Sequence, residues 1–207
     1  MYNKHKKLII IGAGGHGKVC SEIAISLKLW DDVLFLDDSS TDNNLNIVGK
    51  VSDFTNFVQD FDFFCAIGNN ELRKNLHSKI LSKNGNIVSL IHPKAIISSN
   101  VTIGIGTVVM AGAILNNNST IKNGVIINSN SVIEHDCKVN DFVHVSPGCI
   151  ISGSVNIGSE TWIGSGSIVI NNINISSKCL IGAGSLIVKD IAKPGKYFGH
   201  PVQNIEM

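Results

Sequence analysis

Aliphatic residues recur at every sixth position through the second half of the chain. Counted from residue 91, seventeen consecutive positions at this spacing are Ile, Val or Leu. The residue two places before each of these positions is almost always small. The large aliphatic positions are Ile91, Ile97, Ile103, Val109, Leu115, Ile121, Ile127, Ile133, Val139, Val145, Ile151, Ile157, Ile163, Val169, Ile175, Ile181 and Ile187.

A period of six matches neither an α-helix nor a single strand, whose side-chain periods are about 3.6 and about 2. It matches a parallel β-helix, in which each six-residue unit forms one flat side and one corner. Three units make a triangular coil, and successive coils stack about 4.8 Å apart. The pattern therefore predicts a β-helix of five to six coils over residues 91–207, with the aliphatic side chains filling its interior.

The five cysteines fit apolar interiors. Cys137, Cys149 and Cys179 occupy the small inward position of the repeat, and Cys20 and Cys65 lie in apolar runs. An odd number of cysteines without paired spacing argues against a disulfide framework. We therefore expect buried structural thiols and a cytoplasmic location.

Residues 1–90 follow a different pattern and hold 20 of the 33 charged residues. Apolar runs at 7–13, 33–38 and 61–70 predict strands, and helical spacing follows the first and the third of them. Alternating strands and helices favour a parallel sheet with right-handed crossovers. The chain is thus predicted to have two domains, an α/β domain at 1–90 and a β-helix at 91–207.

A glycine-rich turn joins the first predicted strand to the first predicted helix. Gly12, Gly14 and Gly17 match G-x-G-x-x-G, and Asp37 and Asp38 end the second predicted strand. In this dinucleotide-binding pattern, glycines let the backbone approach a diphosphate whose charge the helix N-terminus favours. The domain is too short for a complete dinucleotide fold. A Rossmann-like half-domain can still hold one nucleotide diphosphate; the alternative is a tight turn without a ligand.

Further polar residues fall near the same predicted sheet edge. His16 lies inside the glycine loop, and Gly68, Asn69 and Asn70 end the third predicted strand. Ligands bind at that edge in such folds. Arg73, the only arginine of the chain, follows in the first turn of the next helix. It could assist nucleotide binding or be an ordinary solvated helix charge.

One run within the β-helix departs from the Asn, Ser, Lys and Gly that are usual on its surface. It places Glu134, His135 and Asp136 together, with His144 nine residues later, and both histidines are expected to project outward. A histidine flanked by carboxylates can have a raised pKa and a fixed tautomer, which suits a general base. The alternative is surface histidines on a polar face. Gly153 follows His135 by one coil, where its N–H could serve as an oxyanion donor.

Composition and spacing exclude several classes of function. A net charge of +1 gives no basic footprint for nucleic acid. No stretch of about 18 uncharged apolar residues is present, so no membrane span is expected. Histidine ligands for zinc would have to include His92, which lies 43 residues before His135 and therefore on another side of the prism. We expect no metal.

The motifs IGAGGHGK, FLDD, AIGNNELRK, SVIEHDC, DFVHVSPG, IGAGSLIVKD and FGHPVQNI together resemble those of hexapeptide-repeat acyltransferases that acetylate nucleotide-linked amino sugars. The likeness is greatest to the bacterial UDP-4-amino-sugar N-acetyltransferases of the bacillosamine pathway, with the sialic acid O-acetyltransferase-like proteins as relatives. The resemblance implies a left-handed β-helix, a homotrimer, and acetyl-CoA as co-substrate. It also implies an amino-deoxy sugar whose amine, at C4, attacks the thioester directly. The expected nucleotide is UDP, with dTDP or GDP as alternatives.

The resemblance implies roles for individual residues as well. His135 matches the general base, and Asp136 matches an acidic residue that raises its basicity. The acetyl-CoA-binding matches are His144, Gly153, Ser165 and Ala183. The nucleotide-sugar-binding matches are Ala13, Gly14, Gly15, His16, Asp37, Asp38, Gly68, Asn69 and Asn70.

Three other functions fit part of the sequence. The first is O-acetylation of sialic acid or a related sugar. The second is an NAD-dependent reaction, suggested by the glycine motif with Asp37 and Asp38, although half a dinucleotide fold argues against it. The third is a non-catalytic sugar-binding or structural solenoid, which has no need of the cluster at 134–136.

Overall fold

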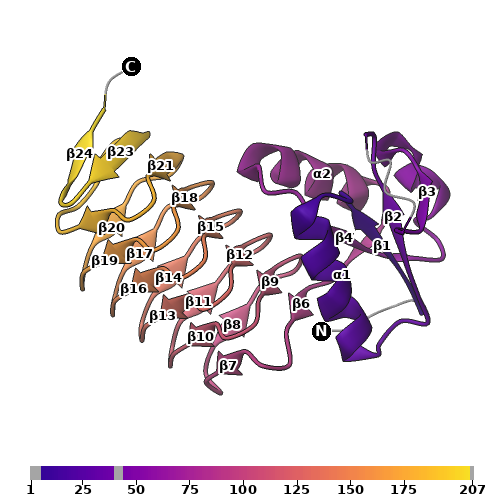
Figure 1. Cartoon of the computed structure of the whole chain (residues 1–207), viewed down its shortest axis with the longest axis horizontal. Helices are drawn as coiled ribbons and strands as arrows, with labels where there is room; N and C mark the ends of the chain where they lie inside the picture. The colour runs from indigo at the N-terminus through magenta and orange to yellow at the C-terminus, as the bar shows by residue number, and fades with distance from the viewer. Residues whose placement is uncertain (1–5, 40–43, 206–207) are drawn as a thin grey trace. The chain divides into compact units, whose positions relative to one another are not determined.

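The computed structural model describes residues 6–39 and 44–205 (Figure 1). Contacts within the chain divide it into two compact units, Met1–Pro93 and Lys94–Met207. The division therefore falls at residue 93, close to the boundary at residue 90 that the change in composition suggests.

The first unit is a parallel sheet of five strands in the order β3-β2-β1-β4-β5. Its strands are β1 (Lys7–Ile11), β2 (Asp32–Leu36), β3 (Ile47–Gly49), β4 (Asp62–Cys65) and β5 (Asn86–Ile87). The helices are α1 (Gly15–Leu27) and α2 (Asn70–Ser82), and a short 3-10 helix, η1 (Val51–Asn56), precedes β4. The strand β6 (Leu90–Ile91) ends the unit.

The core of this unit explains why its strands are continuous apolar runs. Residues 8–11 of β1 and all of β4 are buried, as in a parallel sheet whose two faces are both covered. The predicted α/β character is confirmed. The sequence pattern missed β3 and η1, because both are short and mix polar with apolar residues.

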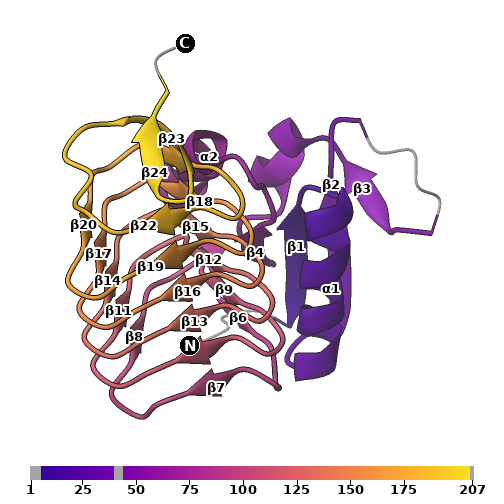
Figure 2. The same ribbon diagram turned by 60° about the vertical axis from the view of Figure 1, so that its left-hand side comes forward.

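The second unit is a parallel β-helix whose short strands form three flat faces, visible as three stacks in Figure 2. The first face contains β7 (Ile96–Ile97), β10 (Ile114–Leu115), β13 (Val132–Ile133), β16 (Ile150–Ile151), β19 (Ile168–Val169) and β22 (Leu186–Ile187). The second face contains β8 (Thr102–Ile103), β11 (Thr120–Ile121), β14 (Lys138–Val139), β17 (Asn156–Ile157) and β20 (Asn174–Ile175). The third face contains β9 (Val108–Val109), β12 (Ile126–Ile127), β15 (His144–Val145), β18 (Trp162–Ile163) and β21 (Cys179–Ile181).

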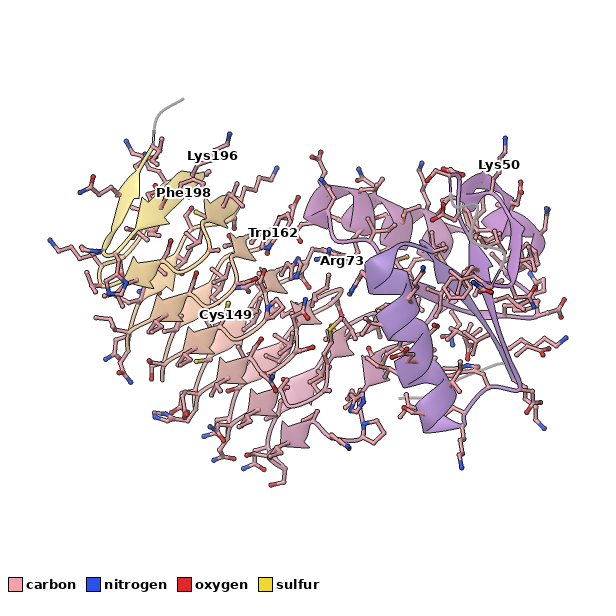
Figure 3. All side chains as sticks on the ribbon, viewed as in Figure 1. Lys50, Arg73, Cys149, Trp162, Lys196 and Phe198 are labelled. Atoms are coloured by element: carbon pink, nitrogen blue, oxygen red, sulfur yellow. The ribbon has the colours of Figure 1, made fainter. Side chains whose placement is uncertain are left out.

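The large aliphatic residues of the six-residue repeat fill the interior of this prism. From Val109 to Ile187, every large aliphatic position is at most 2% exposed. Ile97 and Ile103 are only half-buried, because they belong to the first coil at the open end of the stack. All five cysteines are buried and free, as predicted; Cys149 can be seen inside the coils in Figure 3.

The corners of the coils require left-handed backbone, which accounts for the many Asn and Gly residues between the strands. Asn118, Asp136, Ser154 and Asn172 occupy equivalent corner positions, each with φ near +60°. Asn, Asp and Gly adopt this conformation at the least cost. The corners therefore stack in register, and each coil presents the same position one step further along the prism.

A C-terminal hairpin follows the last coil. Its strands are β23 (Gly195–Gly199) and β24 (Val202–Asn204), and β23 pairs in parallel with β21. Phe198, labelled in Figure 3, lies on β23. Its ring packs against the backbone of Gly182, where any larger residue would collide with it. The sequence pattern did not predict this hairpin.

Candidate active site

The glycine loop after β1 contains two kinds of glycine. Gly12 has φ of +101°, and a side chain at Gly17 would collide with the carbonyl oxygen of Gly12. The geometry of the strand–helix turn alone therefore requires glycine at these two positions. Gly14 and Gly15 differ, because a Cβ at either would meet nothing within 4 Å. They leave the backbone at the N-terminus of α1 open to a ligand, as an anion site requires.

The two aspartates at the end of β2 hold neighbouring loops. Asp37 accepts hydrogen bonds from the backbone N–H of Ala13 at 2.7 Å and of Ser39 at 2.8 Å. Asp38 accepts one from the N–H of Val51 at 2.9 Å, at the start of η1. Asp37 thus fixes the glycine loop from the side, and the Ala13 N–H points at this carboxylate.

The segment after β4 is held from within by Arg73. This side chain is 0% exposed, so the interpretation of Arg73 as a solvated helix charge is wrong. Its guanidinium donates to the carbonyl oxygens of Ile67 at 2.8 Å and Gly68 at 3.2 Å, and to Oδ1 of Asn70 at 2.8 Å. Asn69 caps α2 by accepting from the N–H of Leu72 at 2.9 Å. The polar turn at 68–70 is therefore rigidly held.

His16 lies in the first turn of α1 and is mostly buried. Burial, with the charge of Arg73 as the second cause, lowers the pKa of His16 to about 4. The ring is therefore neutral near pH 7, with its nitrogens 3.8 and 3.9 Å from Sγ of Cys20. A neutral imidazole offers one donor and one acceptor.

The two loops adjoin because β1 and β4 are neighbours in the sheet, with Ile11 paired to Cys65. The strand order places β2 and β3 on one side of β1, and β4 and β5 on the other. In open α/β sheets, ligands bind outside the carboxyl ends of strands at such a switch point. The structure thus gathers the predicted nucleotide-sugar residues at one edge of one sheet.

The predicted catalytic pair lies at a corner of the β-helix between the first and second faces. Nδ1 of His135 is 2.8 Å from Oδ2 of Asp136, and both side chains are about half exposed. Oδ1 of the same carboxylate accepts from Nδ2 of Asn118 at 3.2 Å, one coil earlier. Hydrogen bonds from His135 and then from Asn118 keep the pKa of Asp136 below its usual value. An ionised Asp136 favours the Nδ1–H tautomer of His135, which leaves Nε2 able to accept a proton.

Gly153 lies against the His135 ring, one coil along. A Cβ at Gly153 would be 2.6 Å from Cε1 and 2.7 Å from Nε2 of that ring. The adjacent backbone confirms the predicted stacking, since the N–H of Ser154 donates to the carbonyl oxygen of His135 at 2.9 Å. Glycine at this position therefore makes room for the imidazole.

His144 is more enclosed than the sequence indicates. It projects outward from the third face, as expected, yet only 8% of it is exposed. The next residue in the same column is Trp162, which is labelled in Figure 3. Its ring covers the imidazole by stacking on it at 5.0 Å with an angle of 13°. Nε2 of His144 lies 3.4 Å from Nδ2 of Asn128. Trp162 and Asn128 were not predicted, although a spacing of 18 residues points to Trp162.

The predicted acetyl-CoA residues occupy two separate sides of the prism. Gly153 lies at the His135 corner, and Ser165 and Ala183 stack at the exposed corner between the third and first faces. In a three-sided prism, the corner between the first and second faces is opposite the third face, which carries His144. One chain therefore does not bring His135 and His144 to one point.

Two negative findings apply to residues 6–39 and 44–205. Within these ranges no three His, Cys, Asp or Glu side chains are grouped so that they could hold a metal ion. Neither α1 nor α2 is long and apolar enough to cross a membrane.

Comparison with known proteins decides the family. Residues 7–80 match the family model of the PglD N-terminal domain. The acetyltransferase domain of PglB from Neisseria gonorrhoeae is 36% identical, with a TM-score of 0.94 over 97% of this chain and 100% of that one. The chain belongs to the PglD family of sugar acetyltransferases. The predicted left-handed β-helix after an α/β domain is thereby confirmed.

Other members of this family are described with their substrates. PerB from Caulobacter crescentus, solved with CoA and GDP-perosamine, is 30% identical with a TM-score of 0.92 and covers 100% of both chains. A second structure of the PglB domain contains acetyl coenzyme A. The UDP-N-acetylbacillosamine N-acetyltransferase of Bacillus subtilis is 34% identical over 112 residues. That match covers 51% of this chain and 52% of the enzyme, so it spans about half the length of this curated relative.

Proposed function

We propose that this protein transfers the acetyl group of acetyl-CoA to the amino group, at C4, of a nucleotide-linked amino-deoxy sugar. The observation that carries the proposal is the His135–Asp136 pair, hydrogen-bonded at 2.8 Å on an exposed corner of the β-helix. An oriented imidazole whose second nitrogen is accessible is the group that amide formation from an amine needs. PglB with acetyl coenzyme A and PerB with GDP-perosamine support the two substrate classes.

In the proposed mechanism the neutral sugar amine attacks the carbonyl carbon of the thioester. As the C–N bond forms, Nε2 of His135 accepts a proton from the amine nitrogen. The C–S bond then breaks, and the leaving thiolate takes up that proton as free CoA. Asp136 holds Nδ1–H and stabilises the transient imidazolium. No acyl-enzyme is needed, because holding both substrates together supplies much of the acceleration.

The negative charge that develops on the thioester oxygen needs a donor near His135. The backbone N–H of Gly153 is proposed for this role, with His144 as the second candidate. Gly153 is suited because its backbone lies directly against the His135 ring. A donor aimed at the developing oxyanion typically contributes about 10²-fold or more to the rate.

The outward residues of the β-helix support assembly as a homotrimer. On the second face they are polar, whereas on the first face all six are aliphatic, with exposures reaching 64%, 43% and 37%. The six are Ile96, Ile114, Val132, Ile150, Ile168 and Leu186. A continuous aliphatic column of this length marks a surface for another protein chain. We assign it to neighbouring copies of this chain.

This arrangement would join the two halves of the acetyl-CoA site. With the first face of each copy turned toward a threefold axis, neighbours meet corner to corner. The corner of one copy that carries His135 then faces the corner of the next copy that carries Ser165 and Ala183. His144 lies just beyond that second corner, on the third face. The separation of His135 from His144 within one chain is what a site shared between two copies requires.

The nucleotide diphosphate is proposed to bind at the edge where β1 and β4 end. The open backbone at Gly14, Gly15 and Gly68 would face the phosphates, and His16 offers a neutral ring beside them. UDP is the first expectation, in agreement with the relative from Bacillus subtilis. GDP and dTDP are the alternatives, GDP being the nucleotide of the PerB complex.

An acceptor panel tests this function. The assay measures thiol release from acetyl-CoA with UDP-, dTDP- and GDP-linked 4-amino-4,6-dideoxy sugars, a 3-amino analogue and free sialic acid. The proposal predicts fast release with one nucleotide-linked 4-amino sugar and an N-acetylated product by mass spectrometry. Release with sialic acid alone would instead assign an O-acetyltransferase, and no release with any acceptor would contradict acetyl transfer to sugars.

A further inference from the structure

Arg73 is a fully buried cation that the mechanism above does not use. Among the described residues it is the largest fully buried side chain. Burying a guanidinium is costly, and a polar residue without charge could tie a loop together at lower cost. The position of Arg73 therefore suggests a role that needs both its charge and its planar fork of donors.

The fork holds the segment that joins β4 to α2. One nitrogen, Nη1, donates to the carbonyl oxygens of Ile67 and Gly68, and the other, Nη2, donates to the side chain of Asn70. These bonds fix the carbonyl groups inward. At the start of α2 the N–H of Leu72 donates to the side chain of Asn69, and a Cβ at Gly68 would meet nothing within 4 Å.

The segment held by Arg73 adjoins the glycine loop. A Cβ at Gly12 would lie 2.9 Å from the carbonyl oxygen of Ala66 and 2.8 Å from Cδ1 of Ile67. The Arg73 charge reaches the glycine loop, because it lowers the pKa of His16 in the first turn of α1. Both helix N-termini at this edge therefore share one buried positive charge behind them.

We propose that Arg73 is a positioning residue for the nucleotide diphosphate, holding the turn at 68–70 and adding positive potential behind the glycine loop without touching the ligand. This inference rests on the proposed function, since it concerns the same nucleotide-sugar site. Electrostatic attraction across a partly buried site is much less screened than on the surface. The effect is therefore expected on diphosphate binding and not on acetyl transfer itself.

The test measures the Kd of UDP, GDP and dTDP by calorimetry for the full-length protein and for three variants. Arg73→Gln removes the charge and keeps a hydrogen-bonding group, and Arg73→Lys keeps the charge without the fork. Lys79→Gln is the control, because it removes an exposed positive charge from the last turn of the same helix. We expect Arg73→Gln to raise the Kd of the preferred nucleotide about tenfold, Arg73→Lys to recover part of the loss, and Lys79→Gln to change little.

Two further readouts separate positioning from general destabilisation. In Arg73→Gln, the KM of the nucleotide sugar should rise while kcat and the KM of acetyl-CoA stay within about twofold. By NMR titration, the pKa of His16 should increase in Arg73→Gln and stay low in Arg73→Lys, in the absence of any ligand. If Arg73→Gln does not fold, Arg73→Lys carries the test through the same KM split.

The outcomes are distinct for this inference and for the proposed function. Unchanged nucleotide affinity in folded Arg73 variants, or an unchanged pKa of His16, overturns the inference while acetyl transfer stands. A fall in kcat together with similar increases in both KM values would also overturn it, since such changes indicate a general structural defect. If the wild-type protein binds none of the three nucleotides, both the inference and the nucleotide-sugar substrate are wrong.

Discussion

Replacing Gly153 with alanine separates two explanations for a glycine at this position. An alanine keeps the backbone N–H, so a role as oxyanion donor alone would survive the change. Its Cβ, however, would lie 2.6 Å from Cε1 and 2.7 Å from Nε2 of His135, whereas ordinary van der Waals contact begins at 3.4 Å. The imidazole must therefore move by about 1 Å, and a displacement of that size at a catalytic group can lower a rate by about 100-fold.

The assay is the rate of thiol release at saturating substrate, with melting temperature as the measure of folding. Gly153 is not among the residues with left-handed φ, so its backbone accepts alanine without strain. Asn171→Ala is the matched control, since Asn171 is the exposed residue that follows Gly153 in the same corner column. A fall in kcat near 100-fold in Gly153→Ala, with unchanged folding and a normal control, is expected. A kcat within about threefold of wild type would refute the claim that this glycine sets the position of the His135 ring.

Three other predictions follow from the structure. Burial lowers the pKa of His77 to about 4 from 6.5, so the unfolded chain alone binds this proton between those values. The burial of neutral His77 therefore costs the native state nothing above pH 6.5 but lowers the free energy of unfolding as the pH falls toward 4. In His77→Gln, the drop in the free energy of unfolding over this range, measured with urea, should be smaller by up to about 3 kcal/mol. Asn118→Ala removes one donor to Asp136; because that contact is exposed, kcat should fall only about two- to fivefold, and a larger fall would mean that the bond is stronger than its exposure implies. Ile150→Lys places a charge in the aliphatic column of the first face and should convert the proposed trimer to inactive monomers in light scattering; an active trimer would show that this face is not the interface.

The β-helix could be predicted in detail because its geometry depends on a local and repeated rule. Each large aliphatic position from Val109 onward fills the same interior site, so one period describes the whole unit. The stacking of Gly153 on His135 follows from the same arithmetic of 18 residues per coil. By contrast, β3 and η1 lack a repeat, and only the contacts of the folded sheet select them.

Burial of polar side chains was the least predictable feature. Nothing in the local sequence around Arg73 distinguishes a buried guanidinium from a solvated one, because its acceptors are carbonyl oxygens that the fold brings inward. His144 is buried by Trp162, a neighbour one coil away on the same face. The contact between His144 and Trp162 follows from the face of the prism that both residues occupy, and it can be found in the sequence only by counting 18 residues per coil.

The sequence predicted which residues belong to the candidate site but not where on the β-helix each of them lies. The sequence places His135 and His144 in one unusual run, and the resemblance alone adds Ser165 to them. The three faces show that these residues lie on different sides of one chain, so the acetyl-CoA groove is proposed between copies. The six-residue pattern of a single chain does not indicate which residues come together only when a second copy is present.

Single-turnover acetyl transfer by His135→Ala tests the central claim most directly. The preferred nucleotide sugar from the acceptor panel and acetyl-CoA are supplied at saturation, and nucleotide binding and melting temperature are measured alongside. If His135 is the general base, the rate of amide formation falls by about 10² to 10⁴ while nucleotide affinity and folding stay unchanged. A rate close to that of the wild-type protein would contradict the proposed mechanism, and the proton would have to leave the amine by another route.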